Sequence, residues 1–374
     1  MNEMRAAAPR LEKRIPSLDG LRALSIGLVL IGHVATTQGA PAWMDRGAIS
    51  SLGNIGVRFF FVISGFLITT LLLREREQTG QVSLTGFYLR RAYRILPAML
   101  CYVLIIWALY LAGVIDLTYR VIGRTHLDSA VPDLLHALTF TSNYLHDYNW
   151  YYNHLWSLSV EEQFYLVWPL SLLLLGAVRA SLAAWLVVLV VPFIRLAMHM
   201  SDWGPEISLS REFQAVSDAL AMGVLASLGY NRWMAKAWFR RLIGPGAVVL
   251  AGVCVGLGYG SALYSRPLAY IAGQSLANVG AVILVLHAVT HASGWFGRCL
   301  NTRPLMHMGA LSYSLYLWQE PFLNFTSEAW VARFPVNLLL AWGAAELSYR
   351  IVEKPFLRLK DRLHPPASTM VAKA

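Results

Sequence analysis

Long apolar stretches separated by short polar segments dominate the chain. Ten of them approach the roughly 20 residues that an α-helix needs to cross a hydrocarbon core about 30 Å thick. A helix satisfies its own backbone hydrogen bonds, as a lipid environment requires. The stretches lie near residues 20–37, 53–73, 96–115, 163–176, 180–199, 211–229, 243–260, 269–290, 306–323 and 334–352. The pattern predicts an all-α integral membrane protein with about ten transmembrane helices in one bundle.

The composition supports the same class. Of the 374 residues, 56% are hydrophobic and 14% are charged, whereas soluble proteins average about 25% charged residues. A formal net charge of +10 is compatible with nucleic-acid binding, but 13 Trp and 17 Tyr among long uncharged runs are typical of a bilayer protein. We therefore expect no nucleic-acid partner. Cys101, Cys254 and Cys299 lie far apart and indicate neither a disulfide framework nor a metal site.

The distribution of Lys and Arg predicts the orientation. With the N-terminus inside, most of them fall in cytoplasmic segments, and ten spans return the C-terminus to the same side. The sequence thus divides into a basic cytoplasmic tail over 1–14, a polytopic domain over 15–363 and a disordered cytoplasmic tail over 364–374. The predicted location is the cytoplasmic (inner) membrane, which the chain crosses many times.

One stripe of the first span carries polar side chains. Arg22 and His33 are eleven residues apart, which is about three helical turns, and Asp19 falls near the same line. Ionisable groups this deep usually face a bundle interior or a water-filled cavity. A neutral imidazole there can act as a general base on a hydroxyl, and Arg22 can hold a phosphate-bearing donor. The alternatives are that Asp19 caps the helix, that Arg22 reaches the interface and that His33 is a core histidine.

Six segments resemble motifs of the acyltransferase 3 family of membrane O-acyltransferases. The first, SLDGLRALSIGLVLIGH (17–33), contains Arg22 and His33, and WSLSVEEQFYLVWPL (156–170) is the most specific. The others are FFFVISGFLIT (59–69), FYLRRAYRILP (87–97), SYSLYLWQEPF (312–322) and ELSYRIVEKPF (346–356). The resemblance covers most of the predicted polytopic domain. Gln319-Glu320 is more acidic than the family pattern, so Glu320 is a candidate for tuning the acceptor pocket.

The resemblance implies an enzyme that moves an acyl group, acetyl by default, from acyl-CoA to a hydroxyl of an envelope carbohydrate. Acyl-CoA is then a donor substrate, and we expect no permanently bound cofactor and no metal. His33 is the implied general base, and Asp19 is expected to position Arg22 or the imidazole. A lipid or small-molecule acceptor stays open, as do the oligomeric state and an acyl-enzyme intermediate.

The resemblance also favours a donor-binding role for the basic residues before the third span. Arg90, Arg91 and Arg94 are expected to clamp the phosphates of coenzyme A, since guanidinium groups pair well with phosphate. The alternative is that they set the topology and bind anionic lipid. Ser64 and Gly65 in the second span either leave room for the pantetheine arm or serve close helix packing.

Glu161 and Glu162 follow Trp156 at the predicted outer end of the fourth span. A carboxylate beside aromatic rings is typical of sugar-binding sites, so these three residues are the candidates for acceptor binding. The alternative is that the two acids lie near a helix N-terminus because its dipole favours them. The sequence does not choose between the two glutamates.

Other charged residues in the spans are predicted to be structural. Arg195 and Asp218 can form a buried ion pair. Glu346, Arg350 and Glu353 can form a ladder along the last helix.

A membrane transporter of a lipid-linked sugar or an acyl compound is the competing function, because it would use the same intramembrane ions. Transporters commonly carry inverted repeats and paired broken helices, and neither is evident in the sequence. A ligand-binding sensor is a third class. Consumption of acyl-CoA with formation of an acylated product separates the enzyme from both.

Overall fold

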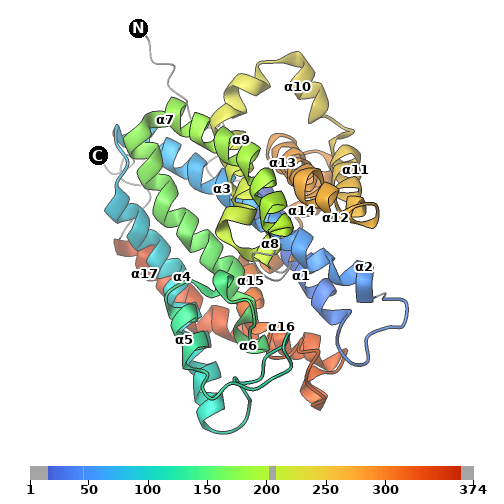
Figure 1. The fold of residues 1–374 in the computed structure, drawn as a ribbon. Coiled ribbons are helices and arrows are strands. Elements are labelled where there is room, and N and C mark those ends of the chain that lie inside the picture. Colours follow the sequence, from blue (N-terminus) through green and yellow to red (C-terminus); the bar gives the residue numbers. More distant parts are fainter. Residues whose placement is uncertain (1–15, 45, 202–207, 364–374) are drawn as a thin grey trace. The chain divides into compact units, whose positions relative to one another are not determined.

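The computed structural model describes residues 16–44, 46–201 and 208–363, and most of them are helical (Figure 1). The longer helices are α1 (Pro16–Val34), α3 (Leu52–Thr79), α4 (Leu84–Leu111), α7 (Leu155–Met200), α9 (Phe213–Met234), α11 (Ala247–Gly260), α13 (Gln274–Thr290), α15 (Arg303–Trp318), α16 (Val336–Ser348) and α17 (Lys354–Leu363). The shorter ones are α2 (Arg46–Ser50), α5 (Val131–Leu138), α6 (Trp150–Asn153), α8 (Ser208–Arg211), α10 (Ala237–Leu242), α12 (Arg266–Leu268) and α14 (Trp295–Leu300), with the 3₁₀ turns η1 (Ser142–Tyr144), η2 (Ser261–Leu263) and η4 (Trp330–Ala332) and the π-helical turns η3 (Ala269–Gly273) and η5 (Tyr349–Glu353). These described residues contain no β-strand, which confirms the all-α prediction. The two predicted tails, 1–14 and 364–374, lie outside the described residues.

Several helices have the length and apolar character of membrane spans, and the chain is a membrane protein. Within the described ranges, five are long and apolar enough to cross a bilayer, namely α1, α3, α4, the segment Trp150–Met200 and the segment Arg266–Thr290. Ala247–Leu263 is a shorter apolar helix. Each of the ten apolar stretches found in the sequence overlaps a helix. Ten spans in one bundle, with both termini cytoplasmic, stay a prediction.

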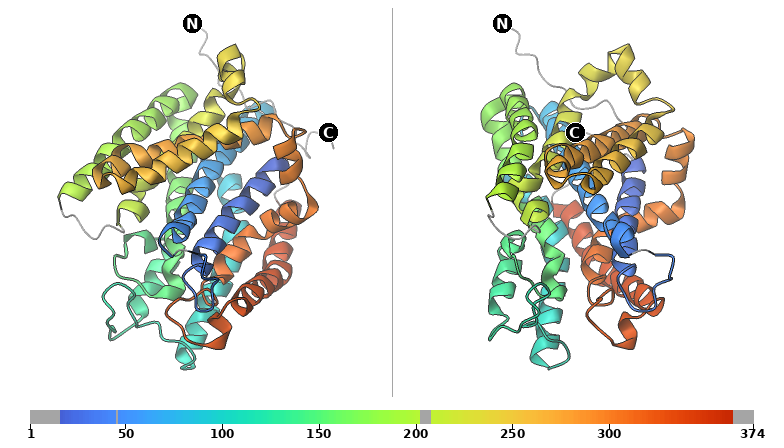
Figure 2. Two further views of the ribbon diagram at one scale, coloured as in Figure 1. Left: turned by 90° about the vertical axis from the view of Figure 1, so that its right-hand side faces the viewer. Right: turned by 45° about the vertical axis from the view of Figure 1, so that its right-hand side comes forward.

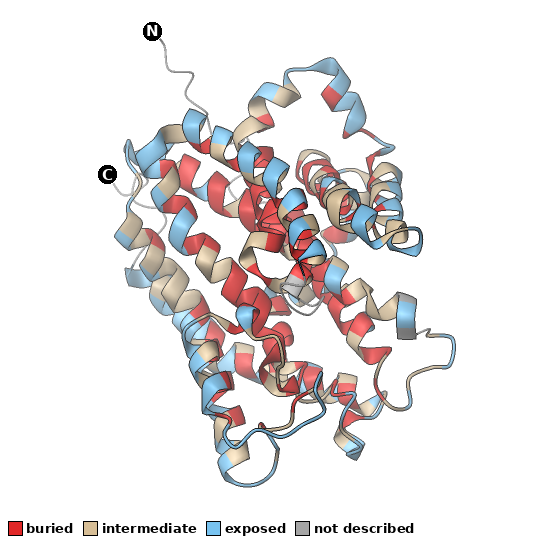
Figure 3. Cartoon of the chain, in the orientation of Figure 1, coloured by how far each residue is buried: buried red, intermediate tan, exposed pale blue. Residues whose placement is uncertain are grey.

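The fourth and fifth predicted stretches form one helical segment, α7, which begins at Leu155. Gly176 interrupts it with a φ of 71°, a left-handed conformation that costs little only for glycine. Along α7, large apolar side chains such as Leu166, Leu174 and Leu182 are exposed, and Figure 3 shows its exposed residues in pale blue. In a membrane protein such side chains can face lipid tails, which are as apolar as leucine.

The chain divides into two compact units. The first contains the residues up to Ser25, Ile55–Val82 and Gln163–Ala310. The second contains Ile26–Asn54, Ser83–Glu162 and the residues from Leu311 onward.

In the first unit, α11 and α13 run side by side (Figure 2). Glycine permits the contact, because a Cβ built on Gly280 of α13 would lie 2.7 Å from the carbonyl oxygen of Ala251 on α11. Close packing at glycine also joins α3 to α9. A Cβ on Gly65 would lie 2.1 Å from the carbonyl oxygen of Leu220, and one on Gly223 would lie 2.2 Å from that of Val62. Small residues therefore set the helix spacing in this unit.

In the second unit, buried polar contacts hold the segment between α4 and α6. Nη1 of Arg120 donates to Oδ1 of Asp133 at 2.7 Å, and Nδ2 of Asn149 donates to the same oxygen at 2.8 Å. Partial burial alone would raise the pKa of Asp116, but hydrogen bonds from the side chain and backbone of Thr118 outweigh it and lower that pKa. The segment between α4 and α6 is thus a folded structure.

Candidate active site

His33 lies in the last turn of α1, in the second unit, with 24% of its side chain exposed. Its Nδ1 is 2.9 Å from Oε1 of Gln319. A carbonyl oxygen only accepts hydrogen bonds, so Nδ1 is the donor in this contact, and in the neutral ring Nε2 then carries the lone pair. The imidazole is thus held in the tautomer that lets Nε2 take a proton from another group.

A buried carboxylate lies next to this hydrogen bond. Gln319 and Glu320 follow the last residue of α15 and precede Pro321, and both side chains are buried. Oε2 of Glu320 is 3.9 Å from Nδ1 of His33. Its other oxygen, Oε1, is 3.7 Å from Nδ1 of His154, the residue that caps the C-terminus of α6. We refer to His33, His154, Gln319 and Glu320 as the His33 cluster.

Aromatic side chains surround the His33 cluster. The indole Nε1 of Trp150 donates to the carbonyl oxygen of Glu320 at 2.8 Å, and the Trp150 ring centroid is 5.7 Å from that of His33. Phe325 packs edge-on against Trp150 at 4.8 Å, and Tyr102 packs edge-on against His154 at 5.2 Å. These rings fix the backbone that carries Glu320 and lower the polarity around the carboxylate.

Asp19 and Arg22 lie in the first unit, at the start of α1. Nη1 of Arg22 is 4.0 Å from Oδ1 of Asp19, and both side chains are mostly shielded. The expected position of Asp19 beside Arg22 is observed. A Cβ on Gly309 would lie 1.9 Å from the carbonyl oxygen of Asp19, so α15 packs directly on this turn.

The basic residues Arg90, Arg91 and Arg94 lie on α4 in the second unit. The helix begins at Leu84, so these residues are already helical. The guanidinium of Arg91 lies 5.9 Å from the ring centroid of Phe87. These three residues belong to the same unit as His33, whereas Arg22 belongs to the other.

Glu161 and Glu162 lie inside α7, together with the buried Trp156. From the sequence, the two acids were expected at the outer end of the fourth span, opposite the arginines of α4. The structure differs, because α7 begins at Leu155 and Glu162 interacts electrostatically with Arg91. That interaction brings an expected acceptor residue and an expected donor residue close together.

Ser64 and Gly65 lie on α3 in the first unit. Oγ of Ser64 accepts a hydrogen bond from the hydroxyl of Tyr165 at 3.3 Å. Gly65 makes the close contact with the Leu220 backbone described above, so it serves helix packing, one of the two alternatives for this pair.

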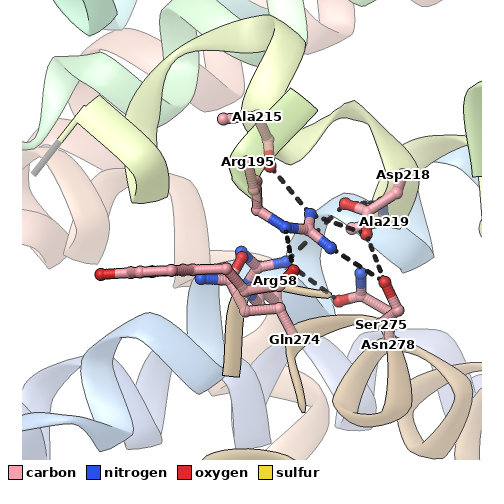
Figure 4. A network of polar contacts seen from close by, with 9 residues as sticks. Arg58, Arg195, Ala215, Asp218, Ala219, Gln274, Ser275 and Asn278 are labelled. Carbon is pink, nitrogen blue, oxygen red and sulfur yellow. Dashed lines mark hydrogen bonds and ion pairs between the residues drawn. The ribbon is translucent and has the colours of Figure 1, made fainter. Parts of the chain in front are cut away.

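The ion pair predicted between Arg195 and Asp218 is confirmed. Nη1 of Arg195 donates to Oδ2 of Asp218 at 2.9 Å, and both side chains are fully buried. Figure 4 shows that a second guanidinium, from Arg58 on α3, also faces this aspartate, with Nη1 at 3.8 Å from Oδ1. Arg58 further donates to the amide oxygens of Asn278 and Gln274 on α13. The network therefore joins α3, α7, α9 and α13 within the first unit.

The ladder expected along the last helix is formed in part. Nε of Arg350 donates to Oε1 of Glu346 at 2.6 Å. Glu353 instead is buried in η5, and its Oε2 accepts a hydrogen bond from Ser314 at 2.9 Å.

Comparison of the sequence with known protein families shows where the chain belongs. A family model described as an acyltransferase domain matches residues 15–345, a range that contains the whole His33 cluster and the predicted donor and acceptor residues. The chain belongs to the acyltransferase 3 family. Residues 15–345 thus form an acyltransferase domain of this family, as the motifs predicted.

Curated relatives of the chain have names that state an activity. O-acetyltransferase OatA of Staphylococcus aureus strain NCTC 8325 / PS 47 is 30% identical over 377 residues, and the OatA of strain COL gives the same values. Each alignment covers 92% of this chain and 58% of the relative. The chain therefore spans little more than half the length of these proteins. No solved structure matches it.

Two members of the His33 cluster, His154 and Glu320, were not among the site residues predicted from the sequence of this acyltransferase 3 member. Glu320 stood out in the sequence only as a departure from the family pattern. The sequence did contain a signal for Glu320. An ionisable residue at the end of an apolar stretch usually faces the interior of a helix bundle. His154 carried no such local signal.

Proposed function

We propose that the protein is a membrane O-acyltransferase that moves an acetyl group from acetyl-CoA to a hydroxyl of a carbohydrate-type acceptor of the cell envelope. Family membership supports acyl transfer, and the curated relatives are named O-acetyltransferases. The hydrogen bond from Nδ1 of His33 to Gln319 carries the mechanistic part of the proposal, because it leaves Nε2 in the form that a general base needs.

In the proposed reaction, Nε2 of His33 removes the proton from the acceptor hydroxyl as its oxygen attacks the thioester carbonyl. The new carbon–oxygen bond forms and the carbon–sulfur bond breaks. The departing thiolate then takes the proton from the His33 imidazolium, so the imidazole returns to its starting state. The products are the acetyl ester and free coenzyme A, and no external oxidant or reductant is needed.

The protein is proposed to cross the inner membrane ten times, with both termini in the cytoplasm. The donor is proposed to enter it from the cytoplasmic side. Its phosphates would be held by Arg22, with Asp19 as its ion-pair partner, and by Arg90, Arg91 and Arg94. Guanidinium groups suit this task because they pair bidentately with phosphate oxygens. Glu161, Glu162 and Trp156 remain the proposed acceptor-binding residues.

The proposal is tested with the full chain in proteoliposomes, supplied with acetyl-CoA and a mixture of envelope glycan fragments. We expect free coenzyme A to be released and glycans to gain the mass of one acetyl group, with one coenzyme A released for each acetyl group transferred. Glycans or lipid-linked sugars that cross the membrane unchanged while acetyl-CoA is not consumed would overturn it in favour of a transporter.

A further inference from the structure

One carboxylate lies between two histidines in the second unit. The two oxygens of Glu320 face different rings, with Oε2 at 3.9 Å from Nδ1 of His33 and Oε1 at 3.7 Å from Nδ1 of His154. The side chains of Glu320 and His154 are 0% and 1% exposed, whereas His33 is accessible. The imidazole of His33 is thus partly exposed, whereas the carboxylate beside it is fully buried.

Two tyrosines next to the His33 cluster donate their hydroxyl protons to backbone carbonyl oxygens. Tyr102 on α4 interacts electrostatically with Glu320, but its hydroxyl donates to the carbonyl oxygen of Tyr151 at 2.6 Å. Tyr316 donates to the carbonyl oxygen of His154 at 2.8 Å. Neither ring nitrogen of His154 has a hydrogen-bond partner within the described ranges. The His33 imidazole is thus placed to neutralise Glu320 when it carries a proton.

Gln319 and Glu320 are adjacent in the chain but can act differently on the same ring. Gln319 is neutral and accepts the hydrogen bond from Nδ1 of His33, which fixes the tautomer and the orientation. Glu320 is too far from Nδ1 for a hydrogen bond, so it acts through its charge. In a buried site, a negative charge close to a forming cation lowers its energy far more than it would in water.

We propose that Glu320 is the counter-ion of the His33 imidazolium formed during acetyl transfer, and that His154 positions Glu320. The inference rests on the proposed function, because it requires His33 to take the acceptor proton. That proton moves from the hydroxyl to Nε2 and on to the coenzyme A thiolate. Glu320 and His154 are therefore positioning residues that gain and lose no proton over the cycle.

The test compares wild type with Glu320→Gln in proteoliposomes, with acetyl-CoA and glycan fragments, from about pH 5 to about pH 9. We expect kcat to fall on the order of tenfold to a hundredfold, with the KM for acetyl-CoA unchanged. Loss of the negative charge weakens proton binding by His33, so the acid limb of the kcat/KM profile should move down by about one pH unit. Glu320→Asp, which keeps the charge, should retain the wild-type limb.

Two further variants make the test specific. His154→Gln should lower kcat in the same direction, because it leaves Glu320 without its second neighbour. Glu212→Gln removes a carboxylate that is equally buried, at 2% exposure, in the first unit, and should leave kcat and the pH profile unchanged. If Glu320→Gln does not yield a monodisperse protein, Glu320→Asp and His154→Gln decide the question.

A wild-type kcat and pH profile in Glu320→Gln would overturn the inference, as would an effect confined to the KM for the acceptor. His33→Ala in the same assay separates the two levels of the account. If it is inactive while Glu320→Gln behaves as wild type, only the counter-ion role is wrong. If His33→Ala is fully active, the proposed mechanism itself is wrong.

Discussion

His33 and Gln319 lie 286 positions apart in the sequence, yet Nδ1 of the first donates to Oε1 of the second at 2.9 Å. This contact orients the imidazole of a histidine in the first predicted span, as the proposed general base requires. Other enzymes likewise use a hydrogen-bond acceptor at one ring nitrogen of a histidine to select the other nitrogen as the reactive one.

Replacing Gln319 with leucine should remove the acceptor behind His33 while keeping the side chain's bulk. We expect kcat to fall about tenfold to a hundredfold, because removal of a partner that orients a functional histidine has effects of that size elsewhere. The KM for acetyl-CoA should not change. Gln319→Glu restores an acceptor at the same place, and steady-state kinetics should find it more active than Gln319→Leu. Equal activity of Gln319→Leu and wild type would contradict the orienting role.

Replacing Arg22 with alanine should weaken donor binding. Loss of a charge-assisted contact to phosphate costs about 1.5–3 kcal/mol, so the KM for acetyl-CoA should rise on the order of tenfold to a hundredfold. Asp19→Asn should have a smaller effect in the same direction, because the arginine remains. The matched control is Arg298→Ala, an exposed arginine on α14, which should keep the wild-type KM. A KM unchanged in Arg22→Ala would remove this residue from the donor site.

The buried network around Asp218 should dominate the stability of the first unit. Asp218→Asn leaves two buried guanidiniums facing an uncharged side chain, and breaking a buried ion pair costs about 3–5 kcal/mol. Thermal unfolding in detergent should therefore shift to clearly lower temperature. Glu346→Gln breaks a pair whose arginine is exposed, which is worth about 0–1 kcal/mol, and should barely move the transition. Similar shifts in both variants would show that the network is not a special source of stability.

The substitution Gly65→Ala should force α3 and α9 apart. The new Cβ would lie 2.1 Å from the Leu220 carbonyl oxygen. Inserting an atom into a packed interior lowers the free energy of unfolding by about 1–3 kcal/mol. Gly252 on α11 has open space at its Cβ position, so Gly252→Ala should be neutral or slightly stabilising. Thermal unfolding of both variants checks the difference. A stable Gly65→Ala with a raised KM for acetyl-CoA would instead favour the pantetheine alternative.

The sequence predicted the features that depend on local pattern. The helical class follows from apolar stretches of membrane length, and the Arg195–Asp218 pair follows because ions inside such stretches need partners. His33 became a candidate site residue because an ionisable group deep in a span is costly and usually faces a bundle interior or a water-filled cavity.

Contacts that depend on how helices cross could not be predicted in the same way. Glu320 meets His154 only because the chain after α15 packs beside the end of α6. Glu162 reaches Arg91 because α4 and α7 begin earlier than the apolar pattern indicated. Apolar periodicity does not mark the polar residues at which a helix begins, so such starts are missed from sequence.

The role of His33 as general base is tested most directly by the release of free coenzyme A from acetyl-CoA in proteoliposomes with saturating glycan fragments. Wild type is compared with His33→Ala and with His136→Ala, which removes a partly buried histidine hydrogen-bonded to Thr141 in the same unit. The account predicts a loss on the order of a hundredfold to ten-thousandfold in His33→Ala and a wild-type rate in His136→Ala. A wild-type rate in His33→Ala, with acetylated glycans formed, would contradict it.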